Sequence, residues 1–434
     1  MAKICRPIVE YRDIISSSGI TVDKYSPPKK TMKRFIRIFK KIDDARIQAM
    51  TEYPLHEILL IAFLAVLGNA SGWNEIERFG IAKQKWLRKF LALKNGIPSH
   101  DTFRRVFSLI DPEQLQKATL IFLLENMDAI KKSLNIKSSE RQLCVDGKEE
   151  RGTGRKYGTA EEIRNLQTLH IYDASNGICL CSTPIDAKTN EIPVAQEALK
   201  RMQLKGSIVT FDALHTQMKT IRIIHEGGGN YVGALKGNQV NLESDASAGF
   251  TAESMKKIRE NRKDYYETVE KSHSQIETRR FYLAGAKHRF NGVEEWRSLR
   301  NFICFEKIIY STITHKETTE IRYYITSLKD VELCADAIRG HWGVENQLHW
   351  HLDYNFHEDD TATIDRQAFT NLSILNKMAL TLCKLAQPLM KNRSIRSIRK
   401  EFSWSFEENL AMLLNVFDED VLKTVLENGK NPEK

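Results

Sequence analysis

Residues 141–147 read RQLCVDG, residues 206–212 read GSIVTFD and residues 231–235 read YVGAL. Each stretch is a short apolar run bounded by polar or glycine residues, which is typical of a buried strand. The first two runs end in a carboxylate, at Asp146 and Asp212. We therefore predict three strands, with acidic side chains at the ends of two of them.

Two further apolar runs, at 166–173 and 178–185, lie between the first two strands. The Ser-Asn-Gly that joins them, at 175–177, is a strong hairpin signal, because Asn-Gly adopts the left-handed backbone of a tight turn. Helical stretches follow at 192–202 and 218–226. The order β-β-β-α-β-α-β predicts a mixed five-stranded sheet with helices on its faces, which is the order of the ribonuclease H-like fold.

A chain of 434 residues predicts two or three domains, and the pattern changes on both sides of the predicted sheet. Apolar residues recur at helical spacing before it, and strand-like runs return after it. The predicted class is α+β or α/β. The predicted parts are a basic arm at 1–41, an all-helical domain at 42–125, a ribonuclease H-like domain at 139–390 with a β-rich insertion at about 240–335, and a basic helical tail at 391–434.

The predicted helical domain contains a short helix that carries two arginines. Ser99 or Asp101 is placed to cap a helix that begins near Thr102, and Arg104 and Arg105 lie close to its start. A turn followed by such a helix is compatible with a helix-turn-helix, whose recognition helix reads bases with its first residues. A plain helical bundle with two surface arginines fits the same pattern and is the favoured interpretation.

The charge of the chain favours a polyanionic partner. It has 65 basic and 56 acidic residues, a net charge of +9, and the arm at 1–41 holds eleven basic residues against three acidic ones. The seven cysteines form no C-x-x-C pair, so neither a disulfide framework nor a zinc ribbon is indicated. We expect no secretory signal and no membrane-spanning run, and a reducing cytoplasm fits.

Ligand sites in α/β sheets form at strand ends, where the two aspartates lie, and such carboxylates suit hard divalent cations such as Mg²⁺. A two-metal site needs a further carboxylate, which we place at Glu345 on a helix predicted over 337–353 with Asp336 as its N-cap. At helical spacing His341, Glu345 and His349 share one face. Two alternatives stay open: zinc bound by these three side chains, and an amphipathic helix whose glutamate is solvated.

Six sequence blocks together resemble the H-repeat-associated transposases of bacterial insertion sequences. The blocks are YPL (53–55) through GIPSHDTFRRVF (96–107), DGK (146–148), NEIP (190–193), DALHTQ (212–217), LKGNQ (235–239) and RGHWGVENQLHWHLD (339–353). One block alone would be weak, but six in the right order are specific, and together they cover about residues 40–390.

The resemblance implies a ribonuclease H-like DDE catalytic domain whose triad, here Asp146, Asp212 and Glu345, holds two Mg²⁺ ions, with Mn²⁺ as a substitute. It implies a DNA transposase that cleaves element ends and joins the freed 3′-hydroxyl to target DNA. The implied partners are double-stranded DNA, as terminal inverted repeats and target, and further copies of the chain in a dimer or higher oligomer. The implied location is the bacterial cytoplasm and its nucleoid. Two alternatives stay open: an inactive DNA-binding relic or repressor of the element, and a nuclease on the same fold.

Transposases of the wider group carry a Tyr-(2)-Arg-(3)-Glu-(6)-Lys signature around the glutamate. This chain departs from it at the other three positions, which hold Ile338, His341 and Leu352. Arg339 is placed to supply the phosphate contact, and Trp342 either stacks an extruded base or packs in the core. His215 either contacts the site or caps the next helix. The residues expected to bind DNA are Arg104, Arg105, Lys236, Arg339, His341, Trp342, Asn346 and His349.

Overall fold

The computed structural model describes residues 29–134, 141–154, 163–185, 190–272, 274–287, 292–361, 363–390 and 393–415. The chain forms two compact units. The sheet unit comprises Ser139–Lys148 and Gln167–Gln347, and the helical unit comprises Met1–Ser138, Glu149–Leu166 and Leu348–Lys434. Residues 1–28 of the predicted basic arm, and residues 391–392 and 416–434 of the predicted tail, lie outside the described residues.

The sheet unit is built on one sheet with the strand order β3-β2-β1-β4-β5-β9-β8-β7-β6. Strand β1 pairs in parallel with β4, and β4 pairs in parallel with β5, whereas β2 and β3 form an antiparallel hairpin. These are the five strands that the sequence predicts. Their bounds are β1 Arg141–Glu150, β2 Leu166–Asp173, β3 Ile178–Ile185, β4 Ser207–Phe211 and β5 Asn230–Leu235.

The sheet is larger than predicted, with nine strands instead of five, because the inserted segment continues it. Strand β9 pairs antiparallel with β5, and β8, β7 and β6 follow, each antiparallel to its neighbour. Helices α9 (Val240–Ala248) and α10 (Ala252–Asn261) precede these strands and contact them. The bounds of the added strands are β6 Tyr265–Ser272, β7 Gln275–Gly285, β8 Asn301–Ser311 and β9 Glu317–Thr326.

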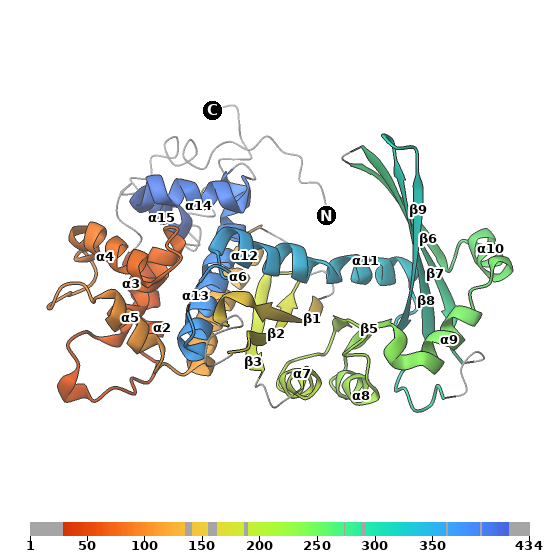
Figure 1. Ribbon diagram of the computed structural model, residues 1–434, viewed down its shortest axis with the longest axis horizontal. Helices are drawn as coiled ribbons and strands as arrows, with labels where there is room; N and C mark the ends of the chain where they lie inside the picture. Colours follow the sequence, from red (N-terminus) through yellow and green to blue (C-terminus); the bar gives the residue numbers. More distant parts are fainter. Residues whose placement is uncertain are drawn as a thin grey trace. The chain divides into compact units, whose positions relative to one another are not determined.

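Helices cover both faces of this sheet. Figure 1 shows α7 (Glu191–Lys200) and α8 (Met218–Glu226) on one face and α11 (Val331–His341) on the other. Side chains alternate along a strand, so Gln142 and every second residue after it on β1 face α11. Gln142 Nε2 accordingly donates to the carbonyl oxygen of Ala337 at 2.7 Å.

Helix α11 packs on the original strands and on the inserted ones. Its buried Cys334 and Ile338 share one core cluster with Ile208 of β4, Phe281 of β7 and Ile303 of β8. The position of α11 on the sheet therefore depends on the insertion as well as on the five predicted strands.

The predicted start of this helix was wrong. It begins at Val331, and Asp330 is its N-cap, with Oδ1 accepting from the backbone N–H of Leu333 at 2.8 Å. Asp336, the predicted cap, lies inside the helix and is exposed. A capping side chain must accept from an N–H in the first turn, which Asp336 is too far along the chain to do.

The predicted continuous helix over 337–353 was also wrong in its middle. Regular α-helix ends at His341, and a π-helical segment over Glu345–His349 leads into α12 (Trp350–Phe356). A π-helix has i→i+5 hydrogen bonds and a wider turn than an α-helix. His341 and Glu345 still line one cavity, whereas His349, at the end of the wider π-helical segment, is not among the residues that line it.

The helical unit centres on α3 and α13. Helix α3 is buried around almost its whole circumference, and α13 contacts α3, α5, α6 and α14. Asn371 of α13 donates to the carbonyl oxygens of Phe107 and Ile110, both at 2.8 Å. These bonds supply hydrogen-bond donors to carbonyl groups at the end of α5 and just after it. The helices are α2 Lys29–Phe39, α3 Leu55–Leu67, α4 Trp73–Leu87, α5 His100–Phe107, α6 Pro112–Leu134, α13 Arg366–Ala386, α14 Ile395–Trp404 and α15 Phe406–Asn415.

Two local features complete this unit. Helices α5 and α6 are separate because Pro112 opens α6 at its first position, where the missing N–H of proline costs no hydrogen bond. Ser99 caps α5, as one of the two predicted choices, by accepting from the N–H of Thr102. Within the part of the chain that the structure describes, no helix has both the length and the apolar character needed to cross a membrane.

Candidate active site

Asp146, Asp212 and Glu345 line one cavity of about 230 Å³ in the sheet unit. Asp146 is on β1, Asp212 directly follows β4, and Glu345 opens the π-helical segment beyond α11. The parallel pairing of β1 and β4 brings the two aspartates to the same edge of the sheet. The structure thus brings together the three acidic residues that the sequence singled out.

Helix α11 advances along β1 toward that edge. Gln142 bonds the carbonyl oxygen of Ala337, and the Cys144 thiol lies 3.5 Å from the carbonyl oxygen of Gly340. Gly340 permits this close approach, since a Cβ at that position would overlap the side-chain amide of Gln142. The glutamate that follows α11 is carried to the strand end by this packing.

Negative charge accumulates in the cavity. Burial raises the pKa of Asp146 to about 7, and the charges of Asp212 and Glu345 add to the rise. A carboxyl group with such neighbours takes up a proton or requires a cation. The cavity therefore favours a bound positive charge.

The turn after β4 fixes Asp212. The backbone N–H of His215 donates to Asp212 Oδ1 at 3.2 Å, and the Thr216 hydroxyl donates to the carbonyl oxygen of Ala234 at 2.6 Å. The His215 ring is buried, with Nε2 2.8 Å from Oε1 of Glu191 at the start of α7. His215 therefore does not cap α8, whose N-cap is Gln217 without a side-chain bond.

His341 stands where the wider group has arginine, and it lines the same cavity. Its Nδ1 lies 3.0 Å from the hydroxyl oxygen of Thr210 on β4, so Nε2 is the ring nitrogen left for the cavity. Burial, with the nearby His215 ring, lowers the pKa of His341 to about 4. At neutral pH the ring is uncharged and cannot replace an arginine charge.

Trp342 lies between two cavities. It lines the carboxylate cavity and a groove of about 460 Å³ along α11, and 40% of its surface is exposed, which is not the exposure of a core residue. The guanidinium of Arg322 on β9 lies 5.1 Å from its ring centroid, a cation–π contact. Asn346 and Arg339 line the groove beside it.

Arg339 already has an acidic partner. Its guanidinium bonds Glu270 of β6 at 2.5 Å, and Glu270 also pairs with Arg279 of β7 at 2.8 Å. The predicted phosphate contact would therefore have to compete with a carboxylate of the insertion.

Two other predicted DNA-binding residues lie at element ends. Lys236 is exposed and directly follows β5, whose Val232 and Ala234 line the carboxylate cavity. His349 ends the π-helical segment and belongs to the helical unit.

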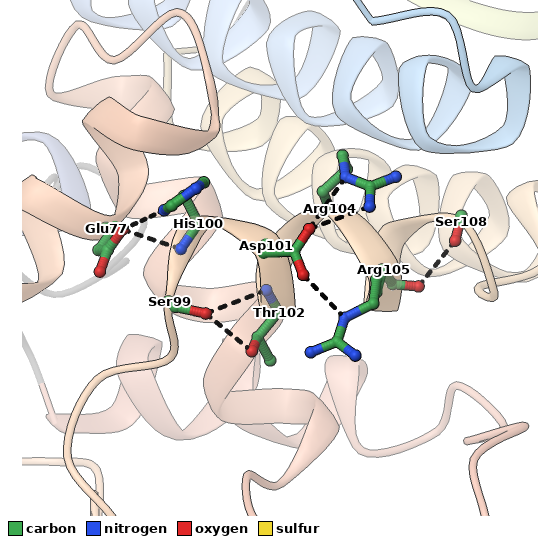
Figure 2. A network of polar contacts seen from close by, with 8 residues as sticks. All are labelled: Glu77, Ser99, His100, Asp101, Thr102, Arg104, Arg105 and Ser108. Carbon is green, nitrogen blue, oxygen red and sulfur yellow. Dashed lines mark hydrogen bonds and ion pairs between the residues drawn. The ribbon is translucent and has the colours of Figure 1, made fainter.

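Arg104 and Arg105 lie on α5 of the helical unit. Figure 2 shows Asp101 between them, with Oδ1 3.0 Å from Arg104 and Oδ2 3.3 Å from Arg105. The hydrogen bond from Arg104 lowers the pKa of Asp101. Exposed ion pairs of this kind add little to stability, so Asp101 holds the two arginines only weakly.

Three residues of the site escaped the sequence analysis as functional candidates. Thr210 holds His341, Arg322 covers Trp342, and Glu191 holds His215. Alternation along the strand could have indicated Thr210, which lies two residues before Asp212 and shares its face. No sequence signal places Arg322 beside Trp342.

The donor set suits a hard divalent cation, because carboxylate oxygens are the ligands that Mg²⁺ prefers. Burial and, after it, repulsion from Asp212 and Glu345 raise the pKa of Asp146, and a bound cation would offset both effects. Over the described residues, no three His, Cys, Asp or Glu side chains have the close spacing of a metal cluster, so the magnesium site on the three carboxylates and the zinc alternative both stay predictions.

Comparison with known proteins gives the family. The family described as Transposase DDE domain matches residues 137–382, and the one described as DDE_Tnp_1-associated matches residues 36–123. The chain therefore belongs to the DDE-domain transposase family, with the associated domain before it.

Its relatives agree with this assignment. The "H repeat-associated putative transposase YhhI" of Escherichia coli K12 is 31% identical over 76% of this chain and 84% of its own length. The "Putative transposase YncI" of Escherichia coli O157:H7 is 31% identical over 79% and 85%. A solved piggyBac transposase, in a synaptic complex with hairpin DNA, aligns with a TM-score of 0.34 and 11% identity over 100% of this chain and 84% of its own, a likeness too slight to support a conclusion.

Proposed function

We propose that the chain is the transposase of an insertion sequence, which cuts DNA at the element ends and joins them to target DNA. The observation that carries this proposal is the convergence of Asp146, Asp212 and Glu345 on one cavity at a sheet edge. Family membership and the transposase names of the relatives support it.

We also propose that β1–β5 with α7, α8 and α11 form a ribonuclease H-like core. The strand order 3-2-1-4-5, the β2–β3 hairpin and the parallel β1–β4–β5 run support it. Strands β6–β9 are then an insertion between the last strand and the last helix of the core. The catalytic domain on this proposal spans residues 139–390.

Asp146, Asp212 and Glu345 would hold two Mg²⁺ ions, for which Mn²⁺ would substitute. Bound there, the ions would activate the attacking oxygen and stabilise the leaving oxygen of a phosphodiester. The chain itself would position these carboxylates. The turn at His215 orients Asp212, and the packing of α11 on β1 places Glu345. Thr210 holds the uncharged His341 ring: when Nδ1 accepts from the Thr210 hydroxyl, Nε2 carries the ring proton and can donate to a phosphate oxygen.

The proposed reaction consists of two phosphoryl transfers. In the first, a water oxygen attacks phosphorus at an element end, the P–O3′ bond breaks, and the leaving oxygen takes up a proton to become a free 3′-hydroxyl. In the second, this hydroxyl attacks a target phosphodiester and displaces the target 3′-oxygen, which is protonated in turn. One phosphodiester bond forms for each one broken in the second step, so no energy source is needed.

DNA contacts are proposed in both units. Lys236, Arg339, Trp342 and Asn346 lie at or beside the carboxylate cavity, together with His341. Residues 42–125, with Arg104 and Arg105 on α5, would bind the terminal repeats. Pairing of two element ends implies a dimer or higher oligomer on DNA.

A cleavage assay tests the proposal. The full chain would be mixed with duplexes carrying the element's terminal repeats and Mg²⁺, beside Asp146→Asn, Asp212→Asn and Glu345→Gln. The matched control is Glu332→Gln, an exposed acid in the first turn of α11 that lines neither the groove nor the carboxylate cavity. We expect metal-dependent nicking at the ends and strand transfer, lost in the three variants and kept in the control, with DNA binding kept in all.

Other results would select another function. Binding to the ends without any cut in the wild type would point to an inactive relic or a repressor. Cutting without end specificity or strand transfer would point to a nuclease on the same fold. Cutting that survives Glu345→Gln would show that the third carboxylate is a different residue.

A further inference from the structure

Glu191 lies against both turns that carry the proposed catalytic aspartates. Its Oε1 is 2.8 Å from Nε2 of His215, whose backbone N–H donates to Asp212. Its carboxylate also lies over Gly147, the residue after Asp146: a Cβ at position 147 would lie 2.5 Å from Oε1 and 2.8 Å from Oε2. One side chain of α7 therefore touches a neighbour of each aspartate.

The contact with His215 is the one that satisfies a buried ring. His215 is 1% exposed, and its Nδ1 has no hydrogen-bond partner within the described residues. Without Glu191, neither ring nitrogen would keep a bond shown here, and unsatisfied buried polar atoms are costly. The Glu191–His215 bond therefore helps to hold the turn whose backbone orients Asp212.

We infer that Glu191 is a positioning residue that sets the spacing of Asp146 and Asp212. This inference rests on the proposed function, because that spacing would determine the affinity of the site for divalent metal. Gly147 and the residues alternating with it face α7, so Glu191 holds the aspartates from the side of the sheet opposite α11. Partners that orient metal ligands without binding the metal are worth about 10–100-fold in metal affinity.

A substitution at Gly147 can displace the Glu191 side chain while the residue at position 191 stays glutamate. The overlap created by a Cβ falls on the far end of a flexible side chain, so the sheet can accept alanine while the Glu191 carboxylate moves away. Gly147→Ala therefore removes the contact with His215 and leaves every acidic residue of the site unchanged.

The experiment is calorimetric titration of the full chain with Mn²⁺, without DNA. Glu191→Ala and Gly147→Ala are expected to bind Mn²⁺ about tenfold or more weakly than wild type. Glu191→Gln keeps an oxygen that accepts from His215 Nε2–H, so its affinity is expected to stay close to that of the wild type. The control is Glu197→Ala, an exposed residue of the same helix that pairs with Lys200.

A second readout separates positioning from simple loss of structure. Cleavage by Glu191→Ala should return at saturating Mn²⁺, whereas a misfolded chain would not be rescued. Melting temperatures of all variants would be measured beside it.

Two results would overturn the inference alone. Equal weakening in Glu191→Gln and Glu191→Ala would mean that charge, and not the hydrogen bond, matters. Unchanged affinity in Glu191→Ala and Gly147→Ala, with Asp146→Asn weakened, would remove the positioning role and leave the proposed function standing. If Asp146→Asn bound Mn²⁺ like the wild type, the proposed metal site itself would fail.

Discussion

At the scale of single residues, the surroundings of Asp146 disfavour its charged form. Burial raises its pKa to about 7, and Asp212 and Glu345 oppose its charge. The folded chain therefore binds this proton more tightly than the unfolded chain does. The stability gained in this way is fully present below about pH 4 and is lost as the pH rises through 7.

Asp146→Asn should therefore stabilise the metal-free protein at high pH. With EDTA present at pH 8, we expect a gain on the order of 2–4 kcal/mol, since one pKa unit is worth about 1.4 kcal/mol. The gain should vanish near pH 4, where both carboxyl and amide are uncharged. Melting temperatures of the two proteins from pH 4 to 8 measure it, and a pH-independent difference would contradict it.

Gly340→Ala should destabilise the sheet unit. A Cβ at 340 overlaps the Gln142 amide, whose bond to the carbonyl oxygen of Ala337 would be lost, at a cost of about 1–3 kcal/mol. Gly343→Ala is the matched control, because its Cβ would lie 4.0 Å from the nearest atoms, in Ala174 and Tyr172. Denaturant unfolding of both variants checks this, and equal stabilities would show that α11 can shift freely.

The positions of the two aspartates could be predicted from the sequence. The residues that hold them in place could not. Asp146 and Asp212 each end a short apolar run, so a shared sheet edge could be predicted. Glu191 reaches His215 from the start of α7, a contact between residues 24 positions apart that depends on tertiary packing. The resemblance marked Glu191 only as part of a motif, without a role.

At the scale of elements, α11 depends on its first turn. Asp330→Ala should cost about 1 kcal/mol, because the cap that accepts from Leu333 is lost, and Asp330→Ser should restore most of it. Asp336→Ala, at the position first predicted as the cap, should change stability little, since it is exposed within the helix. Chemical denaturation distinguishes the two, and a larger loss in Asp336→Ala would reverse the assignment.

Strongly patterned elements are predictable, and weakly patterned ones are not. Helix α8 and strands β2 and β3 have the bounds that the sequence indicates. Strand β6 and helix α10 were not predicted, because β6 is a largely polar edge strand and α10 has no buried residue. The π-helical segment leaves no periodicity that could be read in advance.

At the scale of the whole chain, each unit is assembled from distant stretches. The insertion extends the sheet instead of forming a layer of its own, because β9 pairs antiparallel with β5 at the edge of the five predicted strands. Asn371 bonds backbone groups more than 260 positions earlier in the helical unit. Such pairings depend on which strand edges and which buried polar groups need hydrogen-bond partners. The local sequence pattern does not reveal those partners.

The basic charge of the chain should appear in the salt dependence of DNA binding. Replacing Arg104 and Arg105 by alanine should lower the slope of log affinity against log salt by about 2, roughly 1 for each phosphate contact. Lys257→Ala is the control, an exposed residue of α10 that pairs with Glu253. Fluorescence anisotropy on terminal-repeat DNA measures the slopes, and equal slopes would place the DNA contacts elsewhere.

The position of Glu345 after the insertion has a consequence for biosynthesis. Helix α11 packs on β7 and β8, which precede it in the chain, and Glu345 follows α11, so the third carboxylate is synthesised after all strands of the insertion. A ribosome that stops before residue 331 releases a chain with two of the three acidic groups. A translation product that stops before residue 345 therefore lacks one member of the proposed carboxylate set.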